Sequence, residues 1–301
     1  MESETVYISE TEVSANLRYS EVIGNLEKAF HYLGEGKAQA PPRMRVTGPK
    51  SILNVMPAAI EPMGLSGLKF YHAGKEGGRF MVALFPTQEK GKVFLVEAGI
   101  LGQIRTGALA ALASSLLVKE RNISLGVVGT GFQAESQVLA HASIFKLSRV
   151  KAYSRKEENR KKFQEKMREH GIEVFPVTTI KDLMAGSRVI CTVTNSTDPV
   201  IHLEDLPSVY HINLVGANLP WRREASPEVL NDCELVVVEH LEQAMTESSE
   251  ITGYVNSGFR PVELKDLNHN MDLKRTIFKS MGNGIEDIAA GYTLLKSMKL
   301  I

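Results

Sequence analysis

Disulfide-forming and metal-binding residues are scarce in this sequence, which has only two cysteines among its 301 residues. Cys191 and Cys233 lie in apolar segments typical of strands and show no C-x-x-C spacing, which indicates buried reduced thiols and not a disulfide or a metal pair. No second histidine stands four residues from His72, His141 or His211. We therefore expect no metal site and assign structural roles to these histidines.

An excess of charge and long hydrophobic runs are also missing. The 35 basic and 35 acidic side chains cancel, and no basic run is present, which argues against a nucleic-acid or anionic-membrane partner. The longest near-apolar run, residues 108–118, is shorter than a bilayer span. The first ten residues lack the positive start and the apolar stretch of a signal peptide. We expect a cytoplasmic protein.

A length of 301 residues favours two domains, at about 150 residues each. Within residues 51–98, short apolar segments alternate with turns rich in glycine, proline and charge, a pattern typical of an antiparallel sheet. A helix is predicted before it, over 19–36, because apolar residues recur there at three and four positions. An alanine-rich helix is predicted after it, over 102–120. This part of the chain is expected to form an α+β domain.

Beyond residue 119, apolar strands alternate with helices. The expected strands are 123–129, 149–155, 172–177, 188–194, 209–216 and 234–240, and the expected helices are 156–171, 179–186 and 226–232. Such alternation predicts a parallel, doubly wound α/β sheet of Rossmann type over about 119–270. The final segment, 276–301, has the pattern of a strand, a glycine turn and an amphipathic helix, which either continue this sheet or return to the first domain.

The stretch "GVVGTGFQAESQVLAH", residues 126–141, joins the first of these strands to a helix through a G-x-G-x-x-A pattern. Gly129 and Gly131 form the bend, Gln133 opens the helix, and Ala134 lets helix and strand pack closely. An open helix N-terminus offers N–H groups to a pyrophosphate. The pattern favours a dinucleotide over the alternative of an ordinary tight turn.

The residues after the second Rossmann strand indicate which dinucleotide binds. An acid at this position binds the ribose of NAD, whereas an arginine accommodates the 2′-phosphate of NADP. Here Ser154 and Arg155 come first and no acid occurs before Glu157, so we favour NADP(H); the alternative is that Arg155 only begins a solvated helix.

Three further residues are expected beside the cofactor. They lie at the ends of the fourth and fifth expected strands, where the crevice carries nucleotide in this fold class, and they are Thr192, Thr194 and Gly216.

Three cations in the first domain lie in apolar surroundings. Arg43 follows two prolines, Lys69 lies in a half-apolar strand, and Arg105 lies at the start of a helix of small residues. A buried cation needs an anionic partner. A bound carboxylate would satisfy all three, and acids distant in sequence are the alternative.

The combined order of these segments resembles the ornithine cyclodeaminase/mu-crystallin family. The matching segments are "PPRMRV", "LNVMPA", "GLKF", "IRTGALAALA", "LGVVGTGFQAESQ", "HINLVGAN…RRE" and "FKSMGNGIEDIAA". The resemblance implies a homodimer with a substrate-binding and dimerisation domain over 1–118 and 275–301, and a Rossmann NAD(P)-binding domain over 119–274. It also implies that Arg43, Lys69 and Arg105 bind a substrate carboxylate.

Two positions depart from the pattern of cyclodeaminases in this family. A glutamate before "MP" and an aspartate after "VGA" align with Asn54 and Asn218, which are neutral amides and cannot deprotonate a distal amine. Glu224 or Glu286 would have to replace them.

The expected function is therefore hydride transfer to the C=N bond of an α-imino acid by an NADP(H)-dependent oxidoreductase, with Lys69 as the catalytic residue. The substrate is a cyclic imino acid, or a 2-oxo acid with an amine. Ornithine cyclodeamination and non-catalytic ligand binding remain as alternatives.

Overall fold

The computed structural model describes residues 4–48, 50–74, 77–88, 91–267 and 272–301. The chain forms two compact units with separate sheets, a mixed α/β architecture. Unit 1 comprises Met1–Leu109 and Gly282–Ile301, and unit 2 comprises Ala110–Met281.

Unit 1 is a seven-stranded sheet with helices on one side. Its elements are β1 (Glu4–Ile8), α1 (Glu10–Asn16), α2 (Tyr19–Gly34), β2 (Ala38–Gln39), β3 (Met44–Thr47), β4 (Ser51–Ile60), the 3-10 helix η1 (Glu61–Met63), β5 (Leu65–Gly74), β6 (Gly77–Pro86), β7 (Lys92–Glu97), the first half of α3 (Gly99–Leu117) and α10 (Gly284–Ser297). The strand order is β1-β7-β6-β5-β4-β2, with β3 also paired to β4. The predicted helix over 19–36 and the antiparallel strands β4 to β7 are confirmed. Strand β1, which pairs in parallel with β7, was not predicted.

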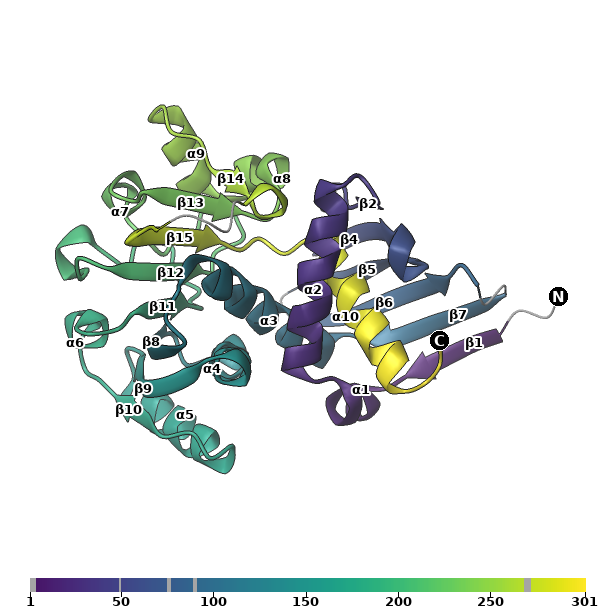
Figure 1. Cartoon of the computed structure of the whole chain (residues 1–301), viewed down its shortest axis with the longest axis horizontal. Helices are drawn as coiled ribbons and strands as arrows, with labels where there is room; N and C mark the ends of the chain where they lie inside the picture. The colour runs from purple at the N-terminus through teal and green to yellow at the C-terminus, as the bar shows by residue number, and fades with distance from the viewer. Residues whose placement is uncertain (1–3, 49, 75–76, 89–90, 268–271) are drawn as a thin grey trace. The chain divides into compact units, whose positions relative to one another are not determined.

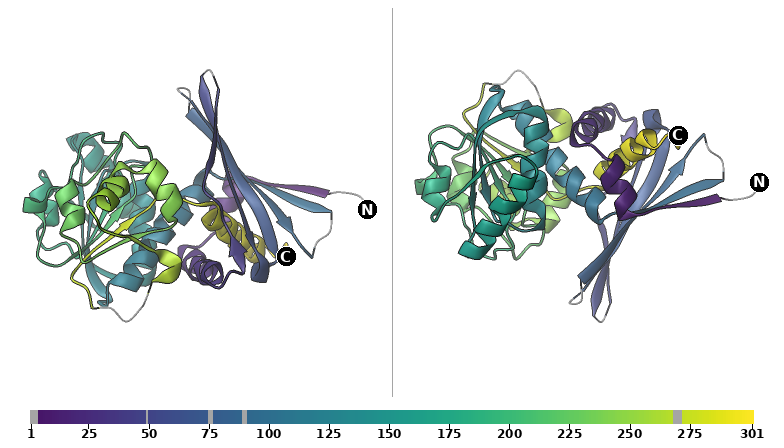
Figure 2. Two further views of the ribbon diagram at one scale, coloured as in Figure 1. Left: turned by 90° about the horizontal axis from the view of Figure 1, so that it is seen from above. Right: turned by 90° about the horizontal axis from the view of Figure 1, so that it is seen from below.

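Helices α2 and α10 cover one face of this sheet, as Figure 2 shows. Because side chains alternate along a strand, Met56, Lys69 and Val82, which are register partners on β4, β5 and β6, point to this covered face and are buried.

The opposite face of the sheet is largely apolar and only partly shielded. We call it the open face. Its apolar members include Leu53, Val55, Leu68, Phe70, Met81, Phe85 and Leu95, and the same register also places Ser66, His72 and Arg79 on it. Leu53 is 42% exposed and Phe85 41%.

Helix α3 is longer than its central apolar run suggested. It has 19 residues, and an 18-residue window of it has a mean hydropathy of 1.3, so by length and composition it is able to cross a membrane. However, 83% of that window is buried inside the structure, as in a core helix. The expectation of a span too short for a bilayer is therefore corrected, and the helix's apolar character is explained by packing.

Unit 2 contains an eight-stranded parallel sheet, shown in Figure 1. Its elements are the second half of α3, β8 (Asn122–Val128), α4 (Phe132–Ile144), β9 (Lys146–Tyr153), α5 (Glu157–Glu169), β10 (Val174–Pro176), α6 (Ile180–Met184), β11 (Val189–Thr192), η2 (Leu203–Asp205), β12 (Tyr210–Leu214), α7 (Pro227–Asn231), β13 (Leu235–Val238), α8 (Leu241–Glu247), α9 (Ser249–Asn256), β14 (Val262–Glu263), η3 (Leu264–Asp266) and β15 (Arg275–Lys279). The strand order is β10-β9-β8-β11-β12-β15-β13-β14. Helices α4 and α5 pack on one face, and α6 to α9 pack on the other, which is the predicted doubly wound arrangement.

One predicted domain boundary is wrong. Residues 275–301 were assigned to the first domain, but β15 pairs with β12 on one side and β13 on the other, inside the Rossmann sheet. Only α10, after the glycine turn, belongs to unit 1. Strand β15 is apolar and buried on both faces. It therefore joins the parallel sheet of unit 2, in which helices cover both faces of a strand.

A directional chain of buried hydrogen bonds crosses unit 2. The Gln137 carbonyl accepts from His141 Nδ1 at 2.7 Å, so His141 Nε2 accepts from Ser114 Oγ at 2.9 Å. Asn213 Nδ2 donates to Ser114 Oγ at 2.9 Å, and His211 Nε2 donates to Asn213 Oδ1 at 3.2 Å. Both histidines are neutral core residues, which agrees with their predicted structural roles.

The two cysteines also behave as predicted. Both Cys191 and Cys233 are free and buried, and burial raises the pKa of each thiol to about 12.

We expect this hydrogen-bond chain to make the fold sensitive to acid. Burial lowers the pKa of His141 from 6.5 to about 4 and that of His211 to about 3. The unfolded chain therefore binds more protons below pH 6.5, and stability should fall by about 2 kcal/mol for each histidine between pH 7.5 and pH 5. Urea unfolding at several pH values measures this loss. The free energy of unfolding should fall less steeply with decreasing pH in His141→Gln than in the wild type. His202→Gln, a control at an exposed position, should keep the wild-type dependence. The same pH dependence in both variants would contradict the role given to buried His141.

Candidate functional site

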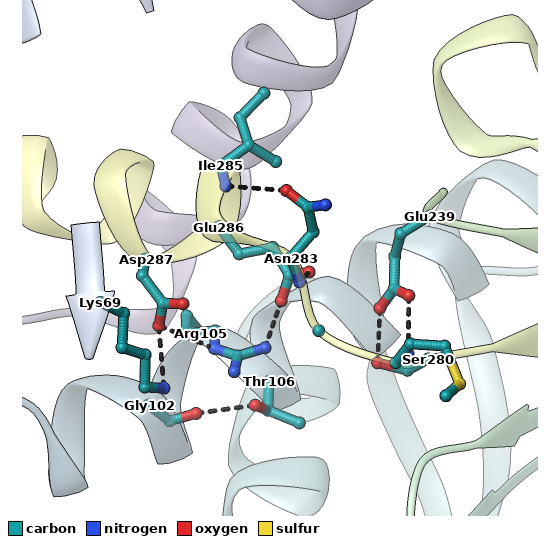
Figure 3. A network of polar contacts seen from close by, with 12 residues as sticks. Lys69, Gly102, Arg105, Thr106, Glu239, Ser280, Asn283, Ile285, Glu286 and Asp287 are labelled. Carbon is teal, nitrogen blue, oxygen red and sulfur yellow. Dashed lines mark hydrogen bonds and ion pairs between the residues drawn. The ribbon is translucent and has the colours of Figure 1, made fainter. Parts of the chain in front are cut away.

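A cluster of buried charged side chains lies in unit 1. Lys69 comes from β5, Arg105 from α3 and Asp287 from the first turn of α10 (Figure 3). Lys69 Nζ and Arg105 Nε each lie 3.1 Å from Asp287 Oδ1. All three side chains are buried, and Asp287 is fully so. The alternative of a distant acidic partner therefore holds for Lys69 and Arg105.

Two further groups connect to this cluster through the turn before α10. Arg105 Nη1 donates to Glu286, whose Oε1 accepts from Asn283 N at 2.6 Å. Arg43 Nη2 donates to the Gly282 carbonyl at 2.9 Å. The structure thus brings Arg43, Lys69 and Arg105 around the start of one helix.

Five charged side chains lie together in this cluster: the cations Arg43, Lys69 and Arg105 and the anions Glu286 and Asp287. Within the described residues, Asp287 Oδ2 is buried and accepts no hydrogen bond. Guanidinium and ammonium groups that converge on one place are the groups that bind a carboxylate in proteins. The chemistry of the cluster therefore fits a carboxylate ligand.

The environment of Lys69 changes its acidity. Burial lowers the pKa of its ammonium group from 10.5 to about 8. Asp287 opposes this shift, and the positive charges of Arg105 and Arg43 add to it. A lysine with this pKa is protonated at neutral pH and releases its proton far more readily than an exposed lysine.

A row of side chains lies beside Lys69 on the same face of the sheet. Asn54 on β4 pairs with Tyr71 on β5, so it is a diagonal neighbour of Lys69 at about 7–8 Å. Asn54 is 4% exposed, and its Oδ1 accepts from Arg45 Nε at 3.1 Å. Phe80 stacks on Tyr71 with ring centroids 4.9 Å apart. Beside Lys69, this row therefore presents the amide of Asn54, which is bonded to the cation Arg45, and the aromatic rings of Tyr71 and Phe80.

The glycine turn of unit 2 has the geometry that a dinucleotide requires. Gly129 has φ +96°, and a Cβ there would lie 2.8 Å from the Val193 carbonyl oxygen. Gly131 precedes α4, and a Cβ there would meet nothing within 4 Å, so the helix N-terminus is open. Ala134 is fully buried against the sheet. These features fit a pyrophosphate at the start of α4. Gln133 is half-buried in the first turn.

The residues after β9 lie next to this turn. Gly129 N donates to the Tyr153 carbonyl at 2.9 Å, so Ser154 and Arg155 follow directly beside the glycine loop. Arg155 is exposed, whereas Arg160 from α5 is buried and hydrogen-bonds to the Ser154 carbonyl. Arg155 is thus available to a ligand, and Arg160 is fixed within the loop.

The ends of β11 and β12 are joined by a carboxylate that the sequence patterns did not place there. Glu224 Oε1 accepts from Thr194 N at 2.7 Å and from Thr194 Oγ1 at 2.8 Å. Its Oε2 accepts from Thr192 Oγ1 at 2.8 Å and from Gly216 N at 2.7 Å. Three predicted cofactor residues therefore share one partner, and Glu224 does not provide the free base that cyclodeamination would need.

Sequence reasoning also missed the partner of Lys69. In the motif "GNGIED", Asp287 is an acid that the dipole of a helix start favours by itself, and no sequence pattern links it to Lys69. Nothing in residue spacing shows that this helix start lies against β5, 218 residues earlier in the chain.

Comparisons with known proteins find relatives over nearly the whole chain. The chain is 32% identical to alanine dehydrogenase of Archaeoglobus fulgidus, over 95% of this chain and 92% of that protein. It is 28% identical to ketimine reductase mu-crystallin of Mus musculus, with 96% of each covered. The solved structure of an archaeal alanine dehydrogenase dimer with bound NAD superposes with a TM-score of 0.83 at 26% identity, covering 99% of this chain and 97% of that one.

The model of one family matches nearly the whole sequence, over residues 3–299. The match includes the cation cluster of unit 1 and the glycine turn of unit 2. The resemblance carried by the seven sequence segments is confirmed, and the chain belongs to the ornithine cyclodeaminase/mu-crystallin family.

Proposed function

We propose that this protein is an NAD(P)-dependent oxidoreductase that interconverts α-imino and α-amino acids. The observation that carries the proposal is the gathering of Arg43, Lys69 and Arg105 around the start of α10, where Lys69 and Arg105 are buried and Lys69 has a lowered pKa. The dinucleotide turn of unit 2 and the names of the relatives, alanine dehydrogenase and ketimine reductase, support it.

The three cations hold the α-carboxylate of the substrate. Arg43 and Arg105 have planar guanidinium groups whose paired N–H donors match the two oxygens of a carboxylate. The Gly282 carbonyl and the carboxylates of Glu286 and Asp287 fix these cations in position. A preorganised site of this kind loses little entropy when it orients the neighbouring C=N group.

Lys69 provides the proton. In the reductive direction the C=N bond becomes CH–NH, so its carbon takes a hydride and its nitrogen takes a proton. Nicotinamide, when bound in reduced form, supplies the hydride. Lys69 Nζ, held by Asp287 at 3.1 Å, gives its proton to the imine nitrogen and recovers one from solvent after turnover.

We propose NADP(H) as the preferred cofactor. Arg155 follows β9 beside the glycine turn, is exposed and is followed by Lys156, so two cations are available to a 2′-phosphate. The related archaeal structure has bound NAD. The proposed preference for NADP(H) is therefore argued from the residues of this chain alone.

The residues next to Lys69 favour an imine or amine without a distal ammonium group. Asn54 carries no charge, and the side chain that donates to it is the cation Arg45. A distal ammonium would meet a positive charge there, whereas the rings of Tyr71 and Phe80 accept apolar or cyclic groups.

A homodimer is also proposed, with the open face of unit 1 as its interface. The open face presents apolar side chains such as Leu53 and Phe85, a composition that favours contact with a second copy of the chain. One related structure is described as a dimer, which supports this state. A cytoplasmic location, without a nucleic-acid or membrane partner, stays a prediction from composition.

The first experiment is a turnover screen of the purified protein. We expect NADPH to be oxidised with at least one of pyruvate plus ammonia, Δ1-pyrroline-2-carboxylate and Δ1-piperideine-2-carboxylate. The rate should fall as pH rises through about 8, where Lys69 loses its proton. Lys69→Met should lower kcat/KM by about 10²–10⁴-fold, since it removes a general acid. The fall of the rate with rising pH should also disappear in this variant. Lys50→Met, at an exposed position of the same unit, should change neither. Tight cofactor binding without any oxidation would instead favour a ligand-binding protein.

The cofactor preference depends on Arg155. Arg155→Asp should weaken NADPH at least tenfold more than NADH, because only NADPH carries the 2′-phosphate that the guanidinium contacts (about 1.4 kcal/mol per tenfold change). Calorimetric titration of both cofactors measures this ratio. Arg168→Asp makes the same charge change near the other end of α5 and should leave the ratio unaltered. If Arg155→Asp also leaves it unaltered, the residue belongs only to the solvated helix.

Ornithine should be a poor substrate. Cyclodeamination requires the enzyme to hold a charged distal amine and take a proton from it, and the side chains at Asn54 and Arg45 offer no base near neutral pH. With NADP⁺ or NAD⁺ present, we expect negligible proline and ammonia from L-ornithine under conditions in which the imino-acid reaction proceeds. Efficient conversion would restore the cyclodeaminase assignment.

A further inference from the structure

Glu224 acts at one half of the Rossmann crevice. The order β10-β9-β8-β11-β12-β15 contains two mononucleotide-binding halves that meet between β8 and β11. The glycine turn after β8 and the residues after β9 serve the adenosine half. The Glu224 carboxylate accepts hydrogen bonds from residues at the ends of β11 and β12, which belong to the other half, where the nicotinamide mononucleotide binds.

The carboxylate is held as an acceptor of four hydrogen bonds. Two of its donors, Thr194 N and Gly216 N, are backbone N–H groups that cannot accept, so each oxygen must present a lone pair. An amide side chain of the same size has one oxygen and one NH2 group. It therefore cannot satisfy both backbone donors at once.

A second buried layer fixes the backbone of Glu224. Its own N–H and that of Ala225 donate to Glu250 Oε1 at 2.8 and 3.0 Å. Glu250 Oε2 pairs with Lys279 Nζ at 2.7 Å, and Lys279 also donates to the Ala217 carbonyl at 2.6 Å. Lys279 is fully buried and Glu250 nearly so. Buried charges of this kind are retained only where opposite charges and hydrogen bonds satisfy them.

The two loops joined by Glu224 are in direct contact. A Cβ at Gly216 would lie 2.3 Å from the Thr194 carbonyl oxygen and 2.5 Å from Glu224 Oε1. No side chain fits between the loops, so their separation is set by the carboxylate that both N–H groups share. A change in this carboxylate must move one loop away from the other.

We propose that Glu224 is a positioning residue for the nicotinamide half of the cofactor. It holds the loops after β11 and β12 at the spacing that this half requires, and the adenosine half does not depend on it. The inference rests on the proposed cofactor, and it makes no claim about which imino acid is the substrate.

Comparing the affinities for NADPH and for 2′,5′-ADP separates the positioning role of Glu224 from a general structural role. In Glu224→Gln, the affinity for NADPH should fall by at least about tenfold, while the affinity for 2′,5′-ADP, which occupies only the adenosine half, should stay within about twofold. Calorimetric titration measures both. Glu228→Gln removes an exposed acid four residues further along and should change neither affinity. If the protein prefers NAD(H), the affinities for NADH and ADP provide the same comparison between the whole dinucleotide and its adenosine half.

A milder variant covers the case in which Glu224→Gln does not fold. Thr192→Val removes one of the four donors without changing side-chain shape, and it should weaken NADPH by a smaller factor and again spare 2′,5′-ADP. Equal losses for both ligands, or unchanged NADPH affinity in folded Glu224→Gln, would overturn the proposal. Failure of the proposed function is a different result: the wild-type protein would then bind neither dinucleotide, or would bind one and reduce no imino acid.

Discussion

The contact between Lys69 and Asp287 is the constraint on which the organisation of unit 1 depends. An ammonium group in the middle of a sheet face covered by helices loses its hydration, and only an opposite charge at hydrogen-bond distance makes this burial tolerable. Asp287 lies in the last helix of the chain, so β5 and α10 must come together for either group to be buried. The turn before α10 also ties Arg43 and Arg105 to the same place.

In unit 2, a buried negative charge likewise depends on partners from segments that are distant in sequence. Among the described residues, its buried carboxylate Glu224 forms no ion pair and is satisfied by four hydrogen-bond donors from two loops. The positive charge of Lys279, which acts on Glu224, is paired with Glu250. Burial raises the pKa of Glu224, and Lys279 partly offsets this effect. In both units, a desolvated charge joins segments that are distant in sequence.

Local patterns in the sequence were sufficient for most elements of the fold. The helix over 19–36, the strands from 51 to 97 and the α/β alternation after 119 all follow from periodicity and turn residues, because each of these signals lies within a few residues. The pairing of β15 was not predictable in this way, since an apolar strand next to a glycine turn fits either sheet. Strand β1 was missed because its five residues alternate weakly and it finds its partner, β7, almost ninety residues later.

The same limit explains which parts of the site were found. Arg43, Lys69 and Arg105 stand out as cations in apolar segments, so composition alone identifies them. Their acidic partners do not stand out, because Asp287 occupies a helix start where an acid is favoured for local reasons. Glu224 follows two arginines and reads as part of a charged surface loop. A residue whose role is to join two distant segments leaves no periodic signal in either.

Burial also lowers the pKa of Lys69, which separates this cluster from a purely stabilising ion pair. An apolar residue in its place would avoid the cost of removing an ammonium from water and would pack on β5 without a partner. The positive charges of Arg43 and Arg105 add to that cost, because both oppose the protonation of Lys69. Under the proposed function, the substrate carboxylate brings a negative charge to these cations, a contribution that a purely structural ion pair does not need.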